Sequence, residues 1–148
     1  MLKGGVMIEG LATLIRVNKW TVDELRRELA ARLTEMEELE LTLVQLEGEL
    51  RQEQHKVAAS PEVAGFFYGY YAEAVIQRRT ELQSLIMAKE DEVNIVQEQL
   101  SGAYRELKKY EVVHEKQKRQ AAKDRARADQ NELDELGLQT RYFRKRWQ

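Results

Sequence analysis

Two long stretches of the chain carry mostly apolar residues at alternating steps of four and three, and the only proline lies between them. The first stretch is Leu11, Ile15, Asn18, Val22, Leu25, Leu29, Arg32, Met36, Leu39, Leu43, Leu46, Leu50, Glu53 and Val57. The second is Leu82, Ile86, Lys89, Val93, Val96, Leu100, Ala103, Leu107, Tyr110, His114, Gln117, Ala121, Asp124 and Ala128. This spacing is typical of long helices that bury a narrow seam against another helix. It predicts no enclosed pocket, so function is expected on the outer faces and at the ends.

The segment between the two stretches has the residues of a helix start. Ser60 suits an N-cap, Pro61 the first helical position and Glu62 the positive end of the helix dipole. We therefore predict an all-α fold, a long antiparallel two-helix coiled-coil hairpin that forms a single domain over residues 1–148. Helix one is expected over about residues 8–58, the turn over 59–61 and a longer helix two over about 61–136. Gly137 is expected to cap helix two, and 137–148 to form a basic, aromatic tail.

A turn centred near Ser60 also predicts the register. Residues whose numbers sum to about 119 should lie opposite each other, which places Arg78 and Arg79 across from three glutamates. These glutamates are Glu37, Glu38 and Glu40. Helix one then ends opposite about residue 111, and residues 112–136 are expected to overhang as a single helix.

The charge of the chain is unevenly distributed. The formal net charge is −2, yet residues 103–148 hold 13 Lys/Arg against 8 Asp/Glu and the remainder holds 11 against 18. The C-terminal third is therefore a basic element on an acidic body. Cysteine is absent, which excludes a disulfide framework. The sequence shows no signal-peptide pattern and no apolar stretch long enough to predict a membrane span.

Sites for chemistry are not evident. His55 and His114 have no second His or Cys at ligand spacing, and the glycine-rich phosphate-binding motifs are absent. Carboxylates on an open helix pair are solvated, which leaves their pKa values suited to neither acid nor base catalysis at neutral pH. We expect a non-enzymatic protein with no catalytic residue, no metal, no cofactor and no small-molecule substrate.

An aromatic cluster marks the predicted start of helix two. Its members are Phe66, Phe67, Tyr68, Tyr70 and Tyr71. One helical face carries Phe67, Tyr71, Ala74 and Arg78 at steps of four, three and four. This face could bind a partner, or part of the cluster could close the end of the hairpin over Val57 and Val63.

The predicted overhang and the tail are rich in cations. The overhang carries Lys116, Lys118, Arg119, Lys123, Arg125 and Arg127, and the tail carries Arg141, Arg144, Lys145 and Arg146 among aromatic residues. Three interpretations stay open: an acidic protein surface as partner, a nucleic acid or an anionic membrane as partner, or a solvated face without a partner.

The chain resembles the FliJ family, small coiled-coil proteins of the flagellar type III export apparatus, over roughly Leu11 to Leu138, in an alphaproteobacterial style. The resemblance rests on the short and long helices and on four local sequences. These are Leu14-Ile15-Arg16-Val17 followed by Leu25-x-x-x-Leu29-Ala30, the glycine-punctuated aromatic cluster, Lys108-Lys109-Tyr110-Glu111, and Leu133-Asp134-Glu135-Leu136-Gly137-Leu138.

The resemblance implies a stalk and adaptor that is cytoplasmic and peripheral at the inner-membrane export apparatus. Its terminal end would enter the hexameric ring of the export ATPase FliI, and it would couple that ring to the export gate protein FlhA and escort export chaperones. The implied ring contacts are Lys116, Lys118, Arg119, Lys123, Arg125, Arg127, Leu133 and Leu136. The implied gate contacts are Phe67, Tyr71, Ala74 and Arg78, of which Arg78 departs from the family pattern. The alternatives are the equivalent stalk of a virulence secretion system, a basic-tailed coiled coil that binds nucleic acid or anionic membrane, and an unrelated structural coiled coil.

Overall fold

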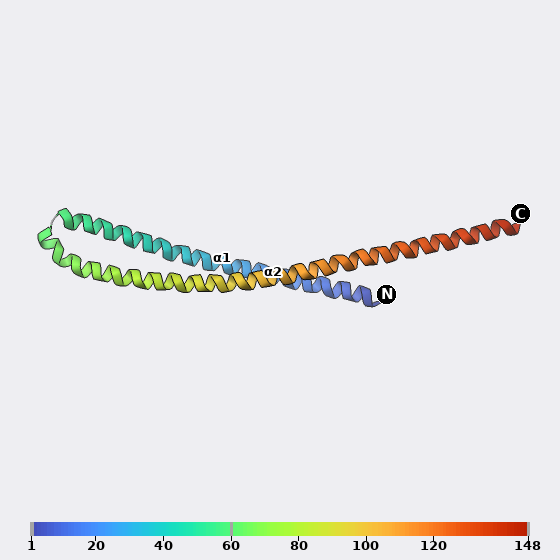
Figure 1. Ribbon diagram of the computed structural model, residues 1–148, viewed down its shortest axis with the longest axis horizontal. Helices are drawn as coiled ribbons and strands as arrows, with labels where there is room; N and C mark the ends of the chain where they lie inside the picture. Colours follow the sequence, from blue (N-terminus) through green and yellow to red (C-terminus); the bar gives the residue numbers. More distant parts are fainter. Residues whose placement is uncertain (1, 60, 148) are drawn as a thin grey trace. The chain divides into compact units, whose positions relative to one another are not determined.

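The computed structural model describes the backbone of residues 2–59 and 61–147, and the side chains of residues 9–59 and 67–147. All of the described backbone is helical. It forms α1 (Leu2–Ala59), with 58 residues, and α2 (Pro61–Trp147), with 87 residues. Figure 1 shows the two elements in sequence colours. The predicted all-α hairpin with a longer second helix is confirmed.

Two predicted helix boundaries are wrong. Helix one was expected from about residue 8, whereas α1 begins at Leu2. Helix two was expected to end near Leu136 with Gly137 as its cap, whereas α2 continues to Trp147. A glycine cap ends a helix by adopting positive φ, and no described glycine does so here. Gly137 therefore lowers the helix propensity locally, by about 1 kcal/mol relative to alanine, without ending the helix. Ser60, the predicted N-cap, lies outside the described residues.

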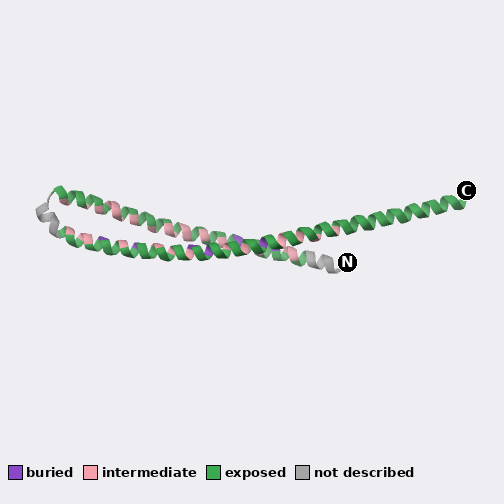
Figure 2. Cartoon of the chain, viewed as in Figure 1, coloured by how far each residue is buried: buried purple, intermediate pink, exposed green. Residues whose placement is uncertain are grey.

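The chain divides into two compact units, each built from parts of both helices. The hairpin unit is Val22–Gly102, and the terminal unit is Met1–Thr21 with Ala103–Gln148. Buried apolar side chains of the hairpin unit are Val22, Val75, Leu82, Val93 and Val96. Those of the terminal unit are Ile15 and Leu107. Figure 2 shows that the buried and half-buried residues follow one side of each helix.

The predicted seams account for this pattern. Every position of the first stretch is buried or half-buried, and so is every position of the second stretch as far as Ala121. Asp124 and Ala128, the last two positions of the second stretch, are exposed. All residues from 122 to 147 are exposed, so the part of α2 without a partner begins later than the predicted residue 112.

The register within the hairpin unit differs from the prediction. Arg32 lies 3.4 Å from Glu92, Lys89 pairs with Glu35, and Arg79 lies 4.0 Å from Glu47. The residue numbers of these pairs sum to 124 or 126, against the predicted 119 or so. The predicted pairing of Arg78 and Arg79 with Glu37, Glu38 and Glu40 is therefore wrong, and Arg78 instead contacts Glu81 of its own helix at 3.3 Å. The centre of the pairing lies beyond Ser60, within the first residues of α2.

Candidate partner-binding surfaces

The aromatic cluster at the start of α2 has an inner and an outer part. Tyr68 and Tyr71 are half-buried, and they line an open pocket between the helices together with Val57, Glu53, Lys56 and the ring of Phe67. Phe67 and Tyr70 keep 67% and 70% of their surface exposed. The half-buried tyrosines are therefore candidates for closing the end of the hairpin, and the exposed members are candidates for binding a partner. Phe66 and Val63 lie outside the side chains that the structure describes.

The phenol of Tyr71 is perturbed by its position against α1. Partial burial raises its pKa, and the negative charges of Glu49 and Glu53 raise it further. Both causes disfavour the phenolate. Tyr71 therefore remains a neutral group that can donate a hydrogen bond to a partner at the edge of the helix pair.

The four predicted gate contacts lie in one row along α2, next to the seam. Phe67, Ala74 and Arg78 are exposed and Tyr71 is half-buried, whereas the following residue Val75 is only 4% exposed. The row is thus displaced from the seam by about one residue, which leaves it accessible beside the buried contact. The guanidinium of Arg78 donates a hydrogen bond to Glu81, so this end of the row is polar.

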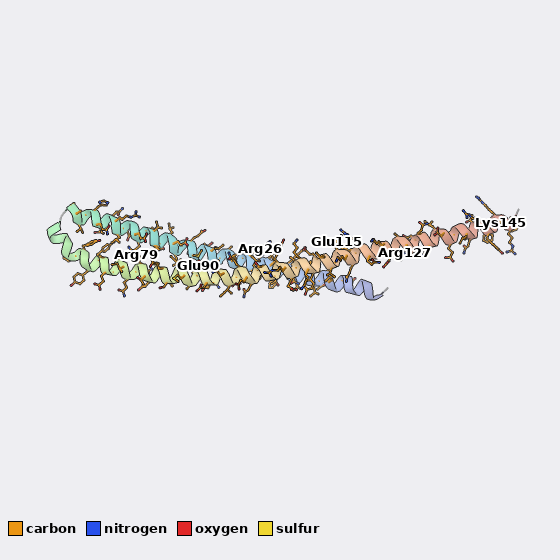
Figure 3. The ribbon with its side chains drawn as sticks, in the orientation of Figure 1. Arg26, Arg79, Glu90, Glu115, Arg127 and Lys145 are labelled. Atoms are coloured by element: carbon orange, nitrogen blue, oxygen red, sulfur yellow. The ribbon has the colours of Figure 1, made fainter. Side chains whose placement is uncertain are left out.

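The predicted ring contacts all lie on α2 in the terminal unit, and all are exposed. Helical spacing places Lys116, Arg119, Lys123 and Arg127 on one face, at steps of three, four and four. Lys118 and Arg125 are seven residues apart and lie on the opposite face. Figure 3 shows Glu115, Arg127 and Lys145 along this part of the helix. Arg119 lies 3.6 Å from Glu115, an exposed pair that restrains it only weakly.

Comparison with known proteins identifies the family. The sequence model described as "Flagellar FliJ protein" matches residues 7–146. The chain belongs to the FliJ family. Two curated relatives, both named "Flagellar FliJ protein", come from the NA1000 and CB 15 strains of Caulobacter vibrioides. Each is 29% identical over 132 residues, which is 89% of this chain and 94% of the relative. No solved structure matches the chain.

The hairpin unit contains a cluster of ion pairs that was not predicted from the sequence. Arg32 and Lys89 occupy seam positions, and the carboxylates of Glu35 and Glu92 lie between them. Lys89 donates hydrogen bonds to both carboxylates, which raises its pKa, and its bond to Glu35 is the main reason that the pKa of Glu35 is lowered. Each seam cation is followed by a glutamate three residues later, and this repeated pattern was the available signal.

A second unpredicted feature is an apolar depression on the N-terminal part of α1. It is lined by Thr13, Arg16, Val17 and Trp20, and Trp20 is 65% exposed. The hydroxyl of Thr13 donates to the carbonyl of Glu9, so its methyl group adds to the apolar surface. Steps of three and four between these residues were visible in the sequence, but they lie off the predicted seam.

The chemistry of the described residues gives no separate site. Among them there is no group of three or more His, Cys, Asp or Glu that could hold a metal ion. None of the described helical segments combines the length and the apolarity that a membrane crossing requires. The candidate surfaces of this FliJ-family protein include the basic faces of α2, the exposed apolar side chains and the row Phe67, Tyr71, Ala74 and Arg78, which we call the aromatic row.

Proposed function

We propose that this protein is a non-enzymatic stalk and adaptor of the flagellar type III export apparatus. The terminal part of α2 enters the hexameric ring of the export ATPase, and the aromatic row near the start of α2 contacts the export gate, with escort of export chaperones. Membership of the FliJ family carries the proposal. The exposure of α2 from residue 122 to 136, where the last of the predicted ring contacts lie, supports it, because an exposed helical segment is accessible to another protein.

The dimensions of that segment fit a ring lumen. A single helix with its side chains is about 10–12 Å wide, and it offers its surface in every direction. Exposed ion pairs contribute only about 0.2–1 kcal/mol each. Several such contacts hold the helix in place without fixing it to one subunit. A ring whose subunits change state in turn can therefore exchange contacts with the stalk one at a time.

The gate contact draws on a different surface. Exposed aromatic side chains that lie beside a rigid helix pair are typical anchors of protein interfaces. Phe67 supplies such an anchor, and the small side chain of Ala74 leaves room for a partner along the same row. Tyr71 adds a neutral hydroxyl at its inner edge.

The ring contact is tested by ATP hydrolysis of the cognate export ATPase with the full-length protein present. Wild-type protein should raise the rate and favour ring assembly. Replacing Lys116, Arg119, Lys123 and Arg127 with glutamate reverses one whole face and should weaken this effect strongly. Lys118→Glu/Arg125→Glu, on the opposite face, should weaken it less than Lys116→Glu/Lys123→Glu, which reverses the same number of charges on the first face. Circular dichroism checks that helicity is retained. If saturating wild-type protein changes neither hydrolysis nor assembly, the stalk role is wrong.

The gate contact is tested by capture of the cytoplasmic part of the gate protein. Phe67→Ala should weaken binding about tenfold or more, as expected for an aromatic anchor. Ile76 is 57% exposed and lies on the opposite face of α2, so Ile76→Ala removes comparable apolar surface as a control. Equal losses from both substitutions would show that the aromatic row is not the contact.

A further inference from the structure

The last four turns of α2 carry a further row of apolar residues at heptad spacing, which nothing covers within the described part of the chain. We call it the terminal stripe. It consists of Leu133, Leu136, Thr140, Phe143 and Trp147, at steps of three, four, three and four. At about 100° per residue these positions lie within an arc of roughly 80°. The large apolar members are 63%, 59%, 58% and 85% exposed in chain order.

The polar atom within the stripe is satisfied inside the helix. The hydroxyl of Thr140 donates to the carbonyl of Leu136 at 2.8 Å, which leaves its methyl group toward the surface. The stripe is therefore continuous in apolar character from Leu133 to Trp147. Exposed side chains of this size in one row indicate a binding surface rather than scattered surface apolarity.

Positive charge surrounds the C-terminal half of the stripe. Arg141, Arg144, Lys145 and Arg146 lie within six residues, and no acidic residue occurs after Glu135. By helical geometry Arg144 and Arg146 lie on the two sides of the stripe. Their long side chains can hold cations beside an apolar surface while the stripe is buried. This arrangement is complementary to a surface that is apolar beneath and negatively charged above.

A second copy of the chain fits this surface less well. Parallel pairing of two stripes would bring the cations that flank them, Arg144 and Arg146 of both copies, to the same end of the pair, where like charges repel. Antiparallel pairing would bring Glu132 near Arg146, but it would join only 15 residues of each chain (133–147). Four large side chains per copy give a contact smaller than a standard-size protein interface.

We propose that residues 133–147 bind the surface of an anionic lipid bilayer as an amphipathic helix lying in the interface. The terminal stripe enters the boundary between headgroups and acyl chains, where Trp and Phe are favoured. Arg144 and Arg146, at the two sides of the stripe, contact phosphate groups, and Arg141 and Lys145 add positive charge near the surface. Leu133 and Leu136 are also predicted ring contacts, so lipid binding and ring insertion exclude each other for this segment. The bilayer would then hold the protein when it is outside the ring.

Co-sedimentation of the full-length protein with vesicles tests the proposal. Vesicles of phosphatidylcholine with about one third phosphatidylglycerol should retain it at physiological salt, and pure phosphatidylcholine should not. Arg144→Gln/Lys145→Gln/Arg146→Gln should weaken binding about a hundredfold, at roughly fivefold per cation. Arg26→Gln/Arg27→Gln, which removes exposed cations from the hairpin unit, is the charge control and should change binding less than threefold.

The apolar contribution has its own matched pair of variants. Trp147→Ser and Phe143→Ser should each weaken vesicle binding about tenfold or more, since a large apolar side chain is no longer buried. Leu138 is 66% exposed and lies on the opposite face of the helix from the stripe. Leu138→Ser should therefore change binding less than threefold. Equal effects of Phe143→Ser and Leu138→Ser would overturn the proposed orientation.

Tryptophan fluorescence gives a second readout. The chain has two tryptophans, so Trp20→Phe leaves Trp147 as the only tryptophan, which can be excited selectively over the tyrosines. Its emission should shift to shorter wavelength with anionic vesicles and stay unchanged with neutral ones. The absence of a shift at saturating anionic lipid would overturn the proposal. Retention on single-stranded RNA that is stronger than on anionic vesicles, and insensitive to Trp147→Ser, would assign the segment to nucleic acid and overturn it equally.

These variants separate the proposal from the stalk function. Phe143, Trp147 and the three substituted cations are not among the predicted ring contacts, so their variants should still raise ATP hydrolysis by the export ATPase. A stalk that works with variants that no longer bind lipid supports two roles of α2 that different residues carry. A wild-type protein that binds lipid without affecting the ATPase would refute only the stalk.

Discussion

Replacing Leu82 with alanine tests whether the seam stabilises the hairpin unit. Leu82 is 1% exposed, the most completely buried side chain among the described residues. It belongs to the second seam, and on both sides along α2 the seam continues through half-buried Arg79 and Ile86. Truncation to alanine removes buried methyl groups and leaves a space that the neighbouring side chains fill only in part.

The magnitude follows from the burial and from the architecture. Leu→Ala in a core costs about 2–5 kcal/mol, and the cost is lowest where the surroundings can collapse. A contact between only two helices can close more readily than a core surrounded on all sides, so we expect a loss of about 2–3 kcal/mol. Domains are stable by roughly 0.05–0.15 kcal/mol per residue. The substitution should therefore remove a large fraction of the stability of the hairpin unit.

Leu85 provides the matched control. It lies three residues further along the same helix, is 47% exposed and undergoes the same chemical change to alanine. Because it loses little burial and alanine is the better helix former, Leu85→Ala should alter the free energy of unfolding by less than about 0.5 kcal/mol. Urea unfolding followed by circular dichroism measures both variants. Equal losses at the two positions, or a loss below about 0.5 kcal/mol at Leu82, would refute the argument that the narrow seam carries the stability.

Three further predictions concern the hairpin unit. The pKa of Glu35 is lowered in the fold, so its ion pair stabilises the protein above about pH 4.3, and this stabilisation is lost as the pH falls through the folded pKa. The pKa of Lys89 is raised, so its ion pair stabilises the protein below about pH 10.4, and this stabilisation is lost as the pH rises through the folded pKa. Lys89→Met should therefore flatten the dependence of the urea midpoint on acid pH, and an unchanged slope would contradict the ion pair. Since the chain has no cysteine, Glu35→Cys/Lys89→Cys should form a disulfide on mild oxidation, detected by gel mobility, faster than Glu35→Cys/Ser84→Cys, which the sequence-based register favoured. Gly48 has open space where a Cβ would lie. Gly48→Ala should therefore raise the free energy of unfolding by about 0.5–1 kcal/mol, and the thermal midpoint with it. A lower midpoint would show that the side chain is not tolerated there.

The sequence was sufficient for the elements because each one repeats its signal many times. Seam positions from Leu11 to Val57 are all at least half-buried, so the apolar spacing alone predicted which face of α1 packs. The end of α2 was missed because it was inferred from a single residue, Gly137, and a single glycine without positive φ lowers helix propensity without ending a helix.

The sequence was sufficient to identify the residues of the candidate surfaces, but not the directions in which their side chains point. The aromatic cluster was visible in the sequence, yet which rings face α1 depends on the register, and Tyr68 and Tyr71 rather than Phe67 and Tyr70 turned out to be half-buried. The terminal stripe was concealed for another reason. It lies in a segment that was expected to be a tail beyond the helix, and the alignment of Phe143 and Trp147 with Leu136 exists only if α2 continues through Gly137.

The register itself shows what the apolar pattern cannot specify. Sliding one helix by one heptad brings seam against seam again, so the apolar residues favour a pairing sum of about 118 almost as well as one of about 125. The charged seam residues distinguish the two. With the smaller sum Arg32 would lie opposite Ile86 and beside Leu85, so it would have no carboxylate across the seam, whereas Lys89 would still reach Glu28, one heptad before Glu35. With the larger sum each cation reaches a glutamate of the other helix, as the pairs Lys89–Glu35 and Arg32–Glu92 show. Desolvating an unpaired cation is costly, so the residues that weaken the seam also select its alignment.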